Sequence, residues 1–204
     1  YGSRIARAAR VLEYAIYYDS DIQHIYDLEH IWVYLDAKDQ PIGVKATRHG
    51  MFITQYATPE KIRYYNHSHP ILYADPGKHA LHTKPKTMRR NILTLVNTKM
   101  AGTQGVYPIH FFTKEQWQRI QPHYPGRKKC FIFFQETVAH EPKYKFTVYK
   151  IFQRPDLMPW AELEKRIEGF LIEFLDKITY YKSTNPKTHN FDILARTPTS
   201  KYFR

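Results

Sequence analysis

The chain has almost no cysteine and no long apolar run. Cys130 is the only cysteine among 204 residues, which excludes an intrachain disulfide and a zinc site built from several cysteines. Because Cys130 lies inside an aromatic run, we expect it to be a buried apolar residue. A membrane-spanning helix needs roughly 20 consecutive apolar residues, and the longest runs, such as Cys130–Phe134, are far shorter. We therefore expect a globular chain without a transmembrane segment.

Acidic residues are scarce relative to basic ones. The chain has 31 Lys and Arg against 19 Asp and Glu, a formal net charge of +12. This excess favours anionic partners, such as nucleic acid, acidic glycans or anionic lipid surfaces; a generally basic surface that maintains solubility is the alternative. No recognised nucleic-acid-binding motif is present. Apolar residues make up 43% of the chain, which is enough for a core and excludes wholesale disorder.

Short strands separated by turns are predicted along much of the chain. Ile5, Ala8 and Leu12 have helical spacing, which predicts a helix over the first dozen residues. Beyond it, β-branched and aromatic residues cluster between turn signals, of which residues 39–43 are the clearest. The predicted strands cover residues 11–18, 24–36, 44–49, 51–56, 70–74, 92–96, 129–136 and 144–152.

Two helices are predicted in the second half. Thr113 and Gln116 have the spacing of a capping box for a short helix that ends near Ile120. Pro159 fits the first turn of a longer amphipathic helix, whose apolar stripe we expect to pack on the sheet. The stripe consists of Leu163, Ile167, Phe170, Leu171, Phe174, Leu175 and Ile178.

These elements predict an α+β fold. We expect a central β-sandwich of about six to eight mostly antiparallel strands with flanking helices, including the long C-terminal amphipathic helix. Residues 1–182 are predicted to form this single domain, and residues 183–204 a polar C-terminal tail.

Acidic residues and a histidine gather where the second predicted strand begins. In a strand, Asp27 and Glu29 point to the same face, about 7 Å apart, where they repel each other and lose solvation. A divalent metal ion would compensate both charges, with His24 and either Asp19 or Asp21 as further ligands. A Lys or Arg partner could neutralise the pair instead, and a solvent-exposed strand end would need no partner at all.

Two other histidines follow predicted strands or turns. His49 precedes Gly50, and His79 follows a turn at residues 75–77. Single loop histidines are usually surface residues, but these could be acid–base groups beside a metal. Basic residues near His79 would form an anion-binding rim, or else a solvated basic face. They are Lys78, Lys84, Lys86, Arg89 and Arg90.

Three segments together resemble a known family. The run His24–His30 resembles the G-H-R-H-D-W-E-H motif of the necrosis- and ethylene-inducing peptide-like proteins, from its first histidine onward. Arg48-His49-Gly50 is similar to that family's His-Gly, and residues 71–81 are similar to its valine-tyrosine strand, turn and T-H-A-L segment. The resemblance covers roughly residues 14–82.

The resemblance implies a β-sandwich with flanking helices and one divalent metal in a surface cavity. Mg²⁺ or Ca²⁺ is expected there, with Mn²⁺ or Zn²⁺ as alternatives. The resemblance also favours a secreted protein, although a single cysteine fits a reducing cytosol too. Carried over position by position, the metal ligands are Asp19 (or Asp21), His24, Asp27 and Glu29, with His49 and His79 lining the cavity.

The chain also departs from the family pattern. Tyr26 replaces the second histidine of the motif, Leu28 replaces its tryptophan, and the family's disulfide cannot form with Cys130 alone. We therefore expect metal-assisted binding of a glycan or lipid headgroup, as in the family's cytolysins. We do not expect the ligand to be the one that those cytolysins bind. The alternative is a metal-dependent hydrolase of a phosphodiester or glycosidic bond, with His49 and His79 as acid–base residues. A metal-stabilised interaction domain without chemistry is a third interpretation.

Overall fold

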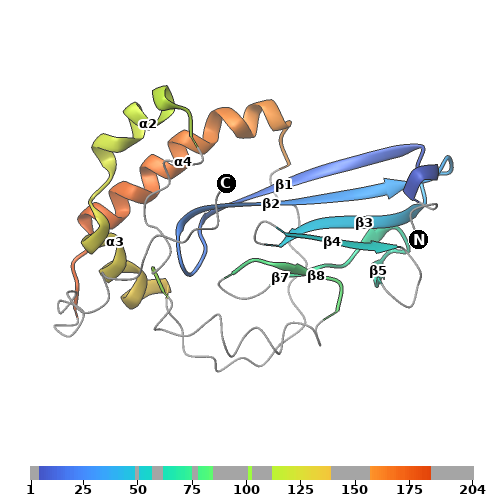
Figure 1. Ribbon diagram of the computed structural model, residues 1–204, viewed down its shortest axis with the longest axis horizontal. Coiled ribbons are helices and arrows are strands. Elements are labelled where there is room, and N and C mark those ends of the chain that lie inside the picture. Colours follow the sequence, from blue (N-terminus) through green and yellow to red (C-terminus); the bar gives the residue numbers. More distant parts are fainter. Residues whose placement is uncertain are drawn as a thin grey trace. The chain divides into compact units, whose positions relative to one another are not determined.

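The computed structural model describes residues 5–48, 51–56, 62–74, 78–84, 101–102, 112–138 and 157–184. These residues fall into two compact units. Unit 1 comprises Tyr1–Tyr18 and Asp27–Leu95, and unit 2 comprises Asp19–Tyr26 and Val96–Arg204. Strands and helices both occur, so the predicted α+β class is confirmed (Figure 1).

A four-stranded sheet provides the framework of unit 1. It contains β1 (Arg10–Ser20), β2 (Ile25–Leu35), β3 (Pro41–Arg48) and β4 (Met51–Tyr56), in that spatial order. The β2–β3 and β3–β4 pairs are antiparallel. Two small antiparallel pairs accompany the sheet: β5 (Tyr64–Tyr65) with β6 (His69–Pro70), and β7 (Tyr73–Ala74) with β8 (Leu81–His82).

The four longer predicted strands of the first half are confirmed, with small shifts at their ends. The predicted N-terminal helix is wrong apart from a single 3₁₀ turn, η1 (Ile5–Arg7), because β1 already begins at Arg10. The predicted strand over residues 70–74 is divided between β6 and β7. The predicted strands 92–96 and 144–152 lie outside the described residues.

The turn between β2 and β3 is fixed by its own side chains. The Asp36 carboxylate accepts hydrogen bonds from the backbone N–H groups of Lys38 (2.8 Å) and Gln40 (2.9 Å), as turn aspartates commonly do. Asp39 has a φ of 60°, in the left-handed region that a tight turn requires. This turn sets the β2–β3 register, in which Val33 pairs with Val44.

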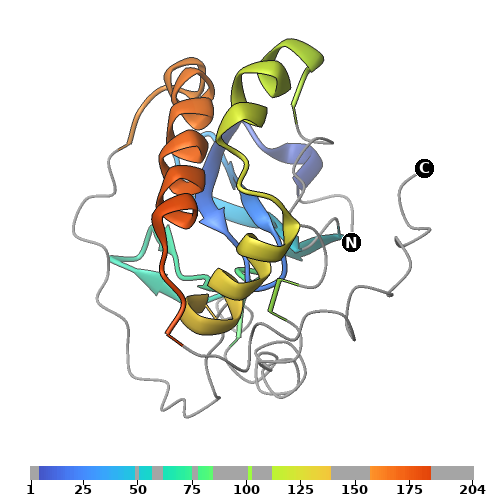
Figure 2. The same cartoon turned by 90° about the vertical axis from the view of Figure 1, so that its left-hand side faces the viewer.

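Helices dominate the described part of unit 2. They are α2 (Lys114–Ile120), the 3₁₀ turn η4 (Gln121–His123), α3 (Arg127–Phe133), the π-helical turn η5 (Phe134–Val138) and α4 (Trp160–Tyr180). Figure 2 shows α2 and α3 beside α4, in agreement with their contacts. The predicted apolar stripe of α4 is largely confirmed, because its buried residues are Ile167, Leu171, Phe174, Leu175 and Ile178.

The predicted strand over residues 129–136 is wrong, because this segment forms α3 and η5. All of Cys130–Phe134 is buried, and an apolar run that is buried on every side carries neither a strand nor a helix period. Burial raises the pKa of Cys130 to about 12, as expected of an unreactive core thiol. The helical form also gives α4 a neighbour that the sequence analysis did not foresee, since only the sheet was expected to cover its stripe.

No helix in the described residues is long and apolar enough to cross a lipid bilayer. The β-sandwich, the single domain over residues 1–182 and the tail over 183–204 stay predictions.

Candidate functional site

Two buried carboxylates lie on one face of β2. The more exposed and less exposed positions alternate along much of this strand, with Asp27, Glu29, Val33 and Leu35 among the buried ones, so the predicted common face of the two carboxylates is confirmed. Asp27 is 9% exposed and Glu29 is 2% exposed. Acidic residues are seldom buried to this degree without compensation.

Glu29 is held from the neighbouring strand. The Thr47 hydroxyl donates a hydrogen bond to Glu29 Oε2 and accepts one from the backbone N–H of His30 at 2.7 Å. Thr47 follows directly on the β2–β3 ladder, which ends with Ile31 opposite Ala46. The threonine side chain thus continues the hydrogen bonding of the ladder and orients the carboxylate.

Asp27 contacts the imidazole of His79, and that ring in turn stacks on a tyrosine. His79 Nδ1 lies 3.1 Å from Asp27 Oδ2, and the His79 ring stacks on the Tyr18 ring, with centroids 3.8 Å apart and planes 9° from parallel. An ionised carboxylate can only accept, so the contact requires a proton on Nδ1. The φ of His79 is 57°, a conformation that is uncommon for residues other than glycine and is often found at functional sites.

Tyr18 lies close enough to both carboxylates for their charges to affect its proton. The pKa of Tyr18 is raised to about 12, first by burial and then by the charges of Asp27 and Glu29. A phenol releases its proton less readily beside negative charge. The tyrosine therefore responds to both carboxylates of the predicted metal site.

The other predicted ligands belong to unit 2. Asp21, which is 1% exposed, accepts hydrogen bonds at Oδ1 from the backbone N–H groups of Gln23 (2.5 Å) and His24 (2.7 Å). Its Oδ2 lies 3.3 Å from His24 Nε2, while His24 Nδ1 lies 2.9 Å from the carbonyl oxygen of Tyr26. Asp19 has an exposed side chain at the end of β1. Asp21, which the sequence left as an alternative to Asp19, thus contacts His24.

The predicted anion-binding residues are only partly described. Lys78 is 3% exposed and is therefore not part of a solvated face, whereas Lys84 is exposed. His49, which was predicted as an acid–base residue, lies outside the described residues, and so do Lys86, Arg89 and Arg90.

Sequence reasoning missed Tyr18 and Thr47. The position of Thr47 could have been found by extending the hairpin from its turn at Asp36, because an antiparallel register places residue 47 opposite residue 30. No sequence signal points to Tyr18, because its stacking depends on how the segment around His79 folds back onto β1.

Carboxylate oxygens and an imidazole are donors that hard divalent cations accept. Within the described part of the chain, no three His, Cys, Asp or Glu side chains form a group that could hold a metal ion. Comparison of the chain with protein-family models, with curated proteins and with solved structures gives no match in any of the three. The family resemblance stays a prediction.

Proposed function

We propose that the Asp27–Glu29 face of β2 binds a divalent cation, Mg²⁺ or Ca²⁺, and through it a glycan or a lipid headgroup. The observation that carries the proposal is the burial of two carboxylates two residues apart on one strand face. A buried pair of like charges is costly unless a cation compensates it.

A protein contact orients each of the two carboxylates. Asp27 contacts His79 through Oδ2. Thr47 holds one oxygen of Glu29. Second contacts of this kind orient carboxylates for a metal. The family resemblance adds a sandwich fold and a surface cavity to the proposal.

A hard cation supplies open positions that sugar hydroxyls or headgroup oxygens can occupy in place of water. The chain itself buries the carboxylates and places His79 and Tyr18 beside them. The net charge of +12 supports binding to anionic surfaces.

The test is binding to a glycan array and to vesicles that contain a glycosylated sphingolipid, with calcium or with a chelator. We expect binding that the chelator abolishes and that Asp27→Asn weakens at least tenfold. Glu13→Gln is the matched control, because Glu13 also lies 3.1 Å from a histidine of the same sheet but is exposed. Binding that is insensitive to both the chelator and Asp27→Asn would overturn the proposal.

A specific contact favours a second function, metal-dependent hydrolysis of a phosphodiester or glycoside. The Asp27 carboxylate contacts His79 at Nδ1, which leaves Nε2 of the same ring as the group that accepts or returns a proton. This function predicts turnover of a generic phosphodiester or glycoside that His79→Gln abolishes while metal binding persists. Turnover that is unchanged in His79→Gln would exclude it.

A further inference from the structure

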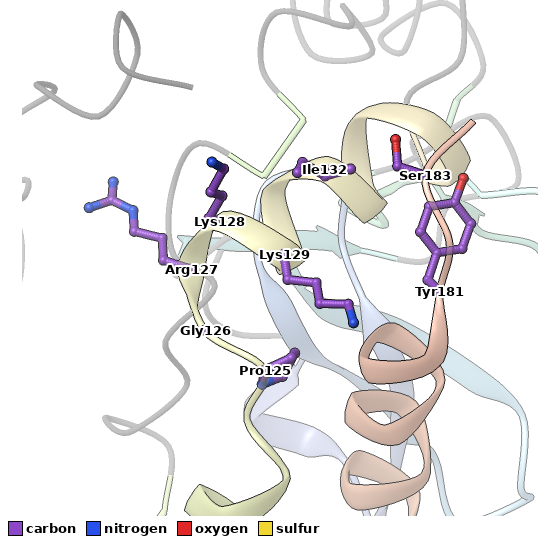
Figure 3. A pocket seen from close by; sticks show the side chains of 8 residues that line it. All are labelled: Pro125, Gly126, Arg127, Lys128, Lys129, Ile132, Tyr181 and Ser183. Carbon is purple, nitrogen blue, oxygen red and sulfur yellow. The ribbon is translucent and has the colours of Figure 1, made fainter. Parts of the chain in front are cut away.

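A pocket of about 460 Å³ lies in unit 2, separate from the residues of the proposed cation site. It is lined by the segment that leads into α3 and by the residues that follow α4. Pro125, Ile132 and Tyr181 contribute apolar surface, whereas Arg127, Lys128 and Lys129 contribute positive charge (Figure 3). Small-molecule sites usually have roughly 300–1,000 Å³, apolar walls and a few placed polar groups.

The three cations of this pocket are not neutralised by carboxylates in the described residues. Elsewhere in the unit, Arg119 binds Glu168 through two hydrogen bonds, and Arg166 pairs with Glu162. No ion pair of this kind involves Arg127, Lys128 or Lys129 within the described segments. Cations that line a cavity and have no carboxylate partner among the described residues favour an anion.

Figure 3 shows how these cations are arranged. Arg127 and Lys128 project from the start of α3, away from Tyr181 and Ser183, and are exposed. Lys129 points toward the end of α4, where its ammonium donates to the carbonyl oxygen of Thr179. An ammonium has three donors, so this contact leaves two for a ligand.

The opposite wall is held in place before any ligand arrives. Tyr181 donates to Glu136 Oε2 at 2.8 Å and Ser183 donates to Oε1 at 2.6 Å, while the Thr184 backbone N–H donates to Oε2 at 3.1 Å. The three donors occupy both oxygens of Glu136. The Tyr181 ring also meets the Phe133 ring edge to face, with centroids 5.2 Å apart. A fixed aromatic wall reduces the entropy lost on binding.

We propose that this pocket binds a phosphate monoester carried on a planar apolar group. The cations would hold the phosphate, and Tyr181 and Ile132 would contact the planar group. The phosphate alone would not contact the apolar wall, and the planar group alone would not contact the cations.

The test is calorimetric titration of the full chain with adenosine 5′-monophosphate, adenosine and inorganic phosphate as probes. We expect the monophosphate to bind saturably and at least tenfold more tightly than either of the other two. Arg127→Gln/Lys128→Gln should weaken it at least tenfold. Both positions are exposed, so the variant should fold, which circular dichroism checks.

The control variant is Lys114→Gln/Lys165→Gln, which removes the same charge from exposed positions on α2 and α4. It should change the dissociation constant less than twofold. The proposal is overturned if the monophosphate does not bind, if phosphate binds as tightly, or if the control weakens binding as much as the pocket variant.

Discussion

At the scale of single residues, the cluster around Asp27 consists of groups that constrain one another. His79 is held by the carboxylate at one ring nitrogen and by the Tyr18 ring on one face. Glu29 is held by Thr47 from the next strand. Each side chain is therefore oriented before a ligand binds, which is what a binding site for a small rigid ligand needs.

The raised pKa of Tyr18 gives a prediction for stability in alkali. The folded-state pKa of about 12 lies above the ordinary value of 10.0, so the folded chain holds this proton more tightly than the unfolded chain. The stabilisation that comes from this residue is complete below pH 10 and is lost as the pH rises from about 10 to about 12. Urea unfolding at several pH values should show this loss.

Tyr18→Phe is the reference for that measurement. It should lose stability less steeply over the same pH interval, because the ring is kept and the titrating hydroxyl is gone. Equal slopes for the two proteins would contradict the assignment. Asp27→Asn should lower the pKa of Tyr18 only in part, since burial is the larger cause.

The sequence predicted part of this cluster for a clear reason. Side chains alternate along a strand, so the common face of Asp27 and Glu29 followed from recognising β2. The contact between Asp27 and His79 joins residues 52 positions apart, and no local pattern encodes such a distance. Only the family resemblance placed His79 near the acidic residues.

At the scale of elements, α2 depends on its first turn. Thr113 accepts a hydrogen bond from the Gln116 backbone at 3.2 Å, and the Gln116 side chain accepts one from the Thr113 backbone at 2.9 Å. This confirms the predicted capping box. A cap of this kind usually contributes about 0.5–2 kcal/mol to stability.

Replacing this cap should weaken the protein measurably. Thr113→Ala should lower the free energy of unfolding by about 1 kcal/mol, because it removes one of the two capping hydrogen bonds. Thr113→Ser keeps the hydroxyl and should stay close to wild type. Urea unfolding curves of both variants measure the difference, and a similar loss in the two would show that the hydroxyl is not responsible.

The buried stripe of α4 should be far more sensitive than its exposed face. Leu171 is 0% exposed, and truncation of a buried leucine usually costs about 2–5 kcal/mol. Leu171→Ala should therefore lower the midpoint of urea unfolding strongly, whereas Glu164→Ala on the exposed face should change it little. Equal effects of the two substitutions would mean that α4 does not bury this stripe.

The elements that the sequence predicted well have a helical period, a cap or a turn signal at their ends. Helical spacing identified α4, and β-branched and aromatic residues next to a turn signal identified β2. The run Cys130–Phe134 has no period, since every position is buried, and its phenylalanine and isoleucine content favoured a strand. Tertiary packing, and not local sequence preference, determines that this segment is helical.

At the scale of the whole molecule, the chain passes between the two units more than once. Residues Asp19–Tyr26 belong to unit 2 but connect β1 to β2 of the sheet. Within unit 2, this segment is tied to a turn by the hydrogen bond from the Gly102 N–H to the Ile22 carbonyl, at 2.8 Å. An opening of either unit would disturb the residues at both ends of this segment.

We therefore expect the two units to unfold in one cooperative transition. Circular dichroism at 222 nm follows the helices, and the α-helices in the described residues lie in unit 2. The fluorescence of a Trp117→Phe/Trp160→Phe variant follows Trp32, in unit 1. For that variant the two signals should change at the same urea concentration; separate midpoints would contradict the single domain predicted from the sequence.

The proposed function depends on a cation at the buried acidic face of β2. The most direct test is the metal content of the purified protein after dialysis against micromolar Mg²⁺ and Ca²⁺, measured by mass spectrometry. We predict one equivalent of a divalent ion per chain in the wild type and in Glu13→Gln, and none in Asp27→Asn/Glu29→Gln. A wild type without metal, or a double variant that retains it, would contradict the proposed site.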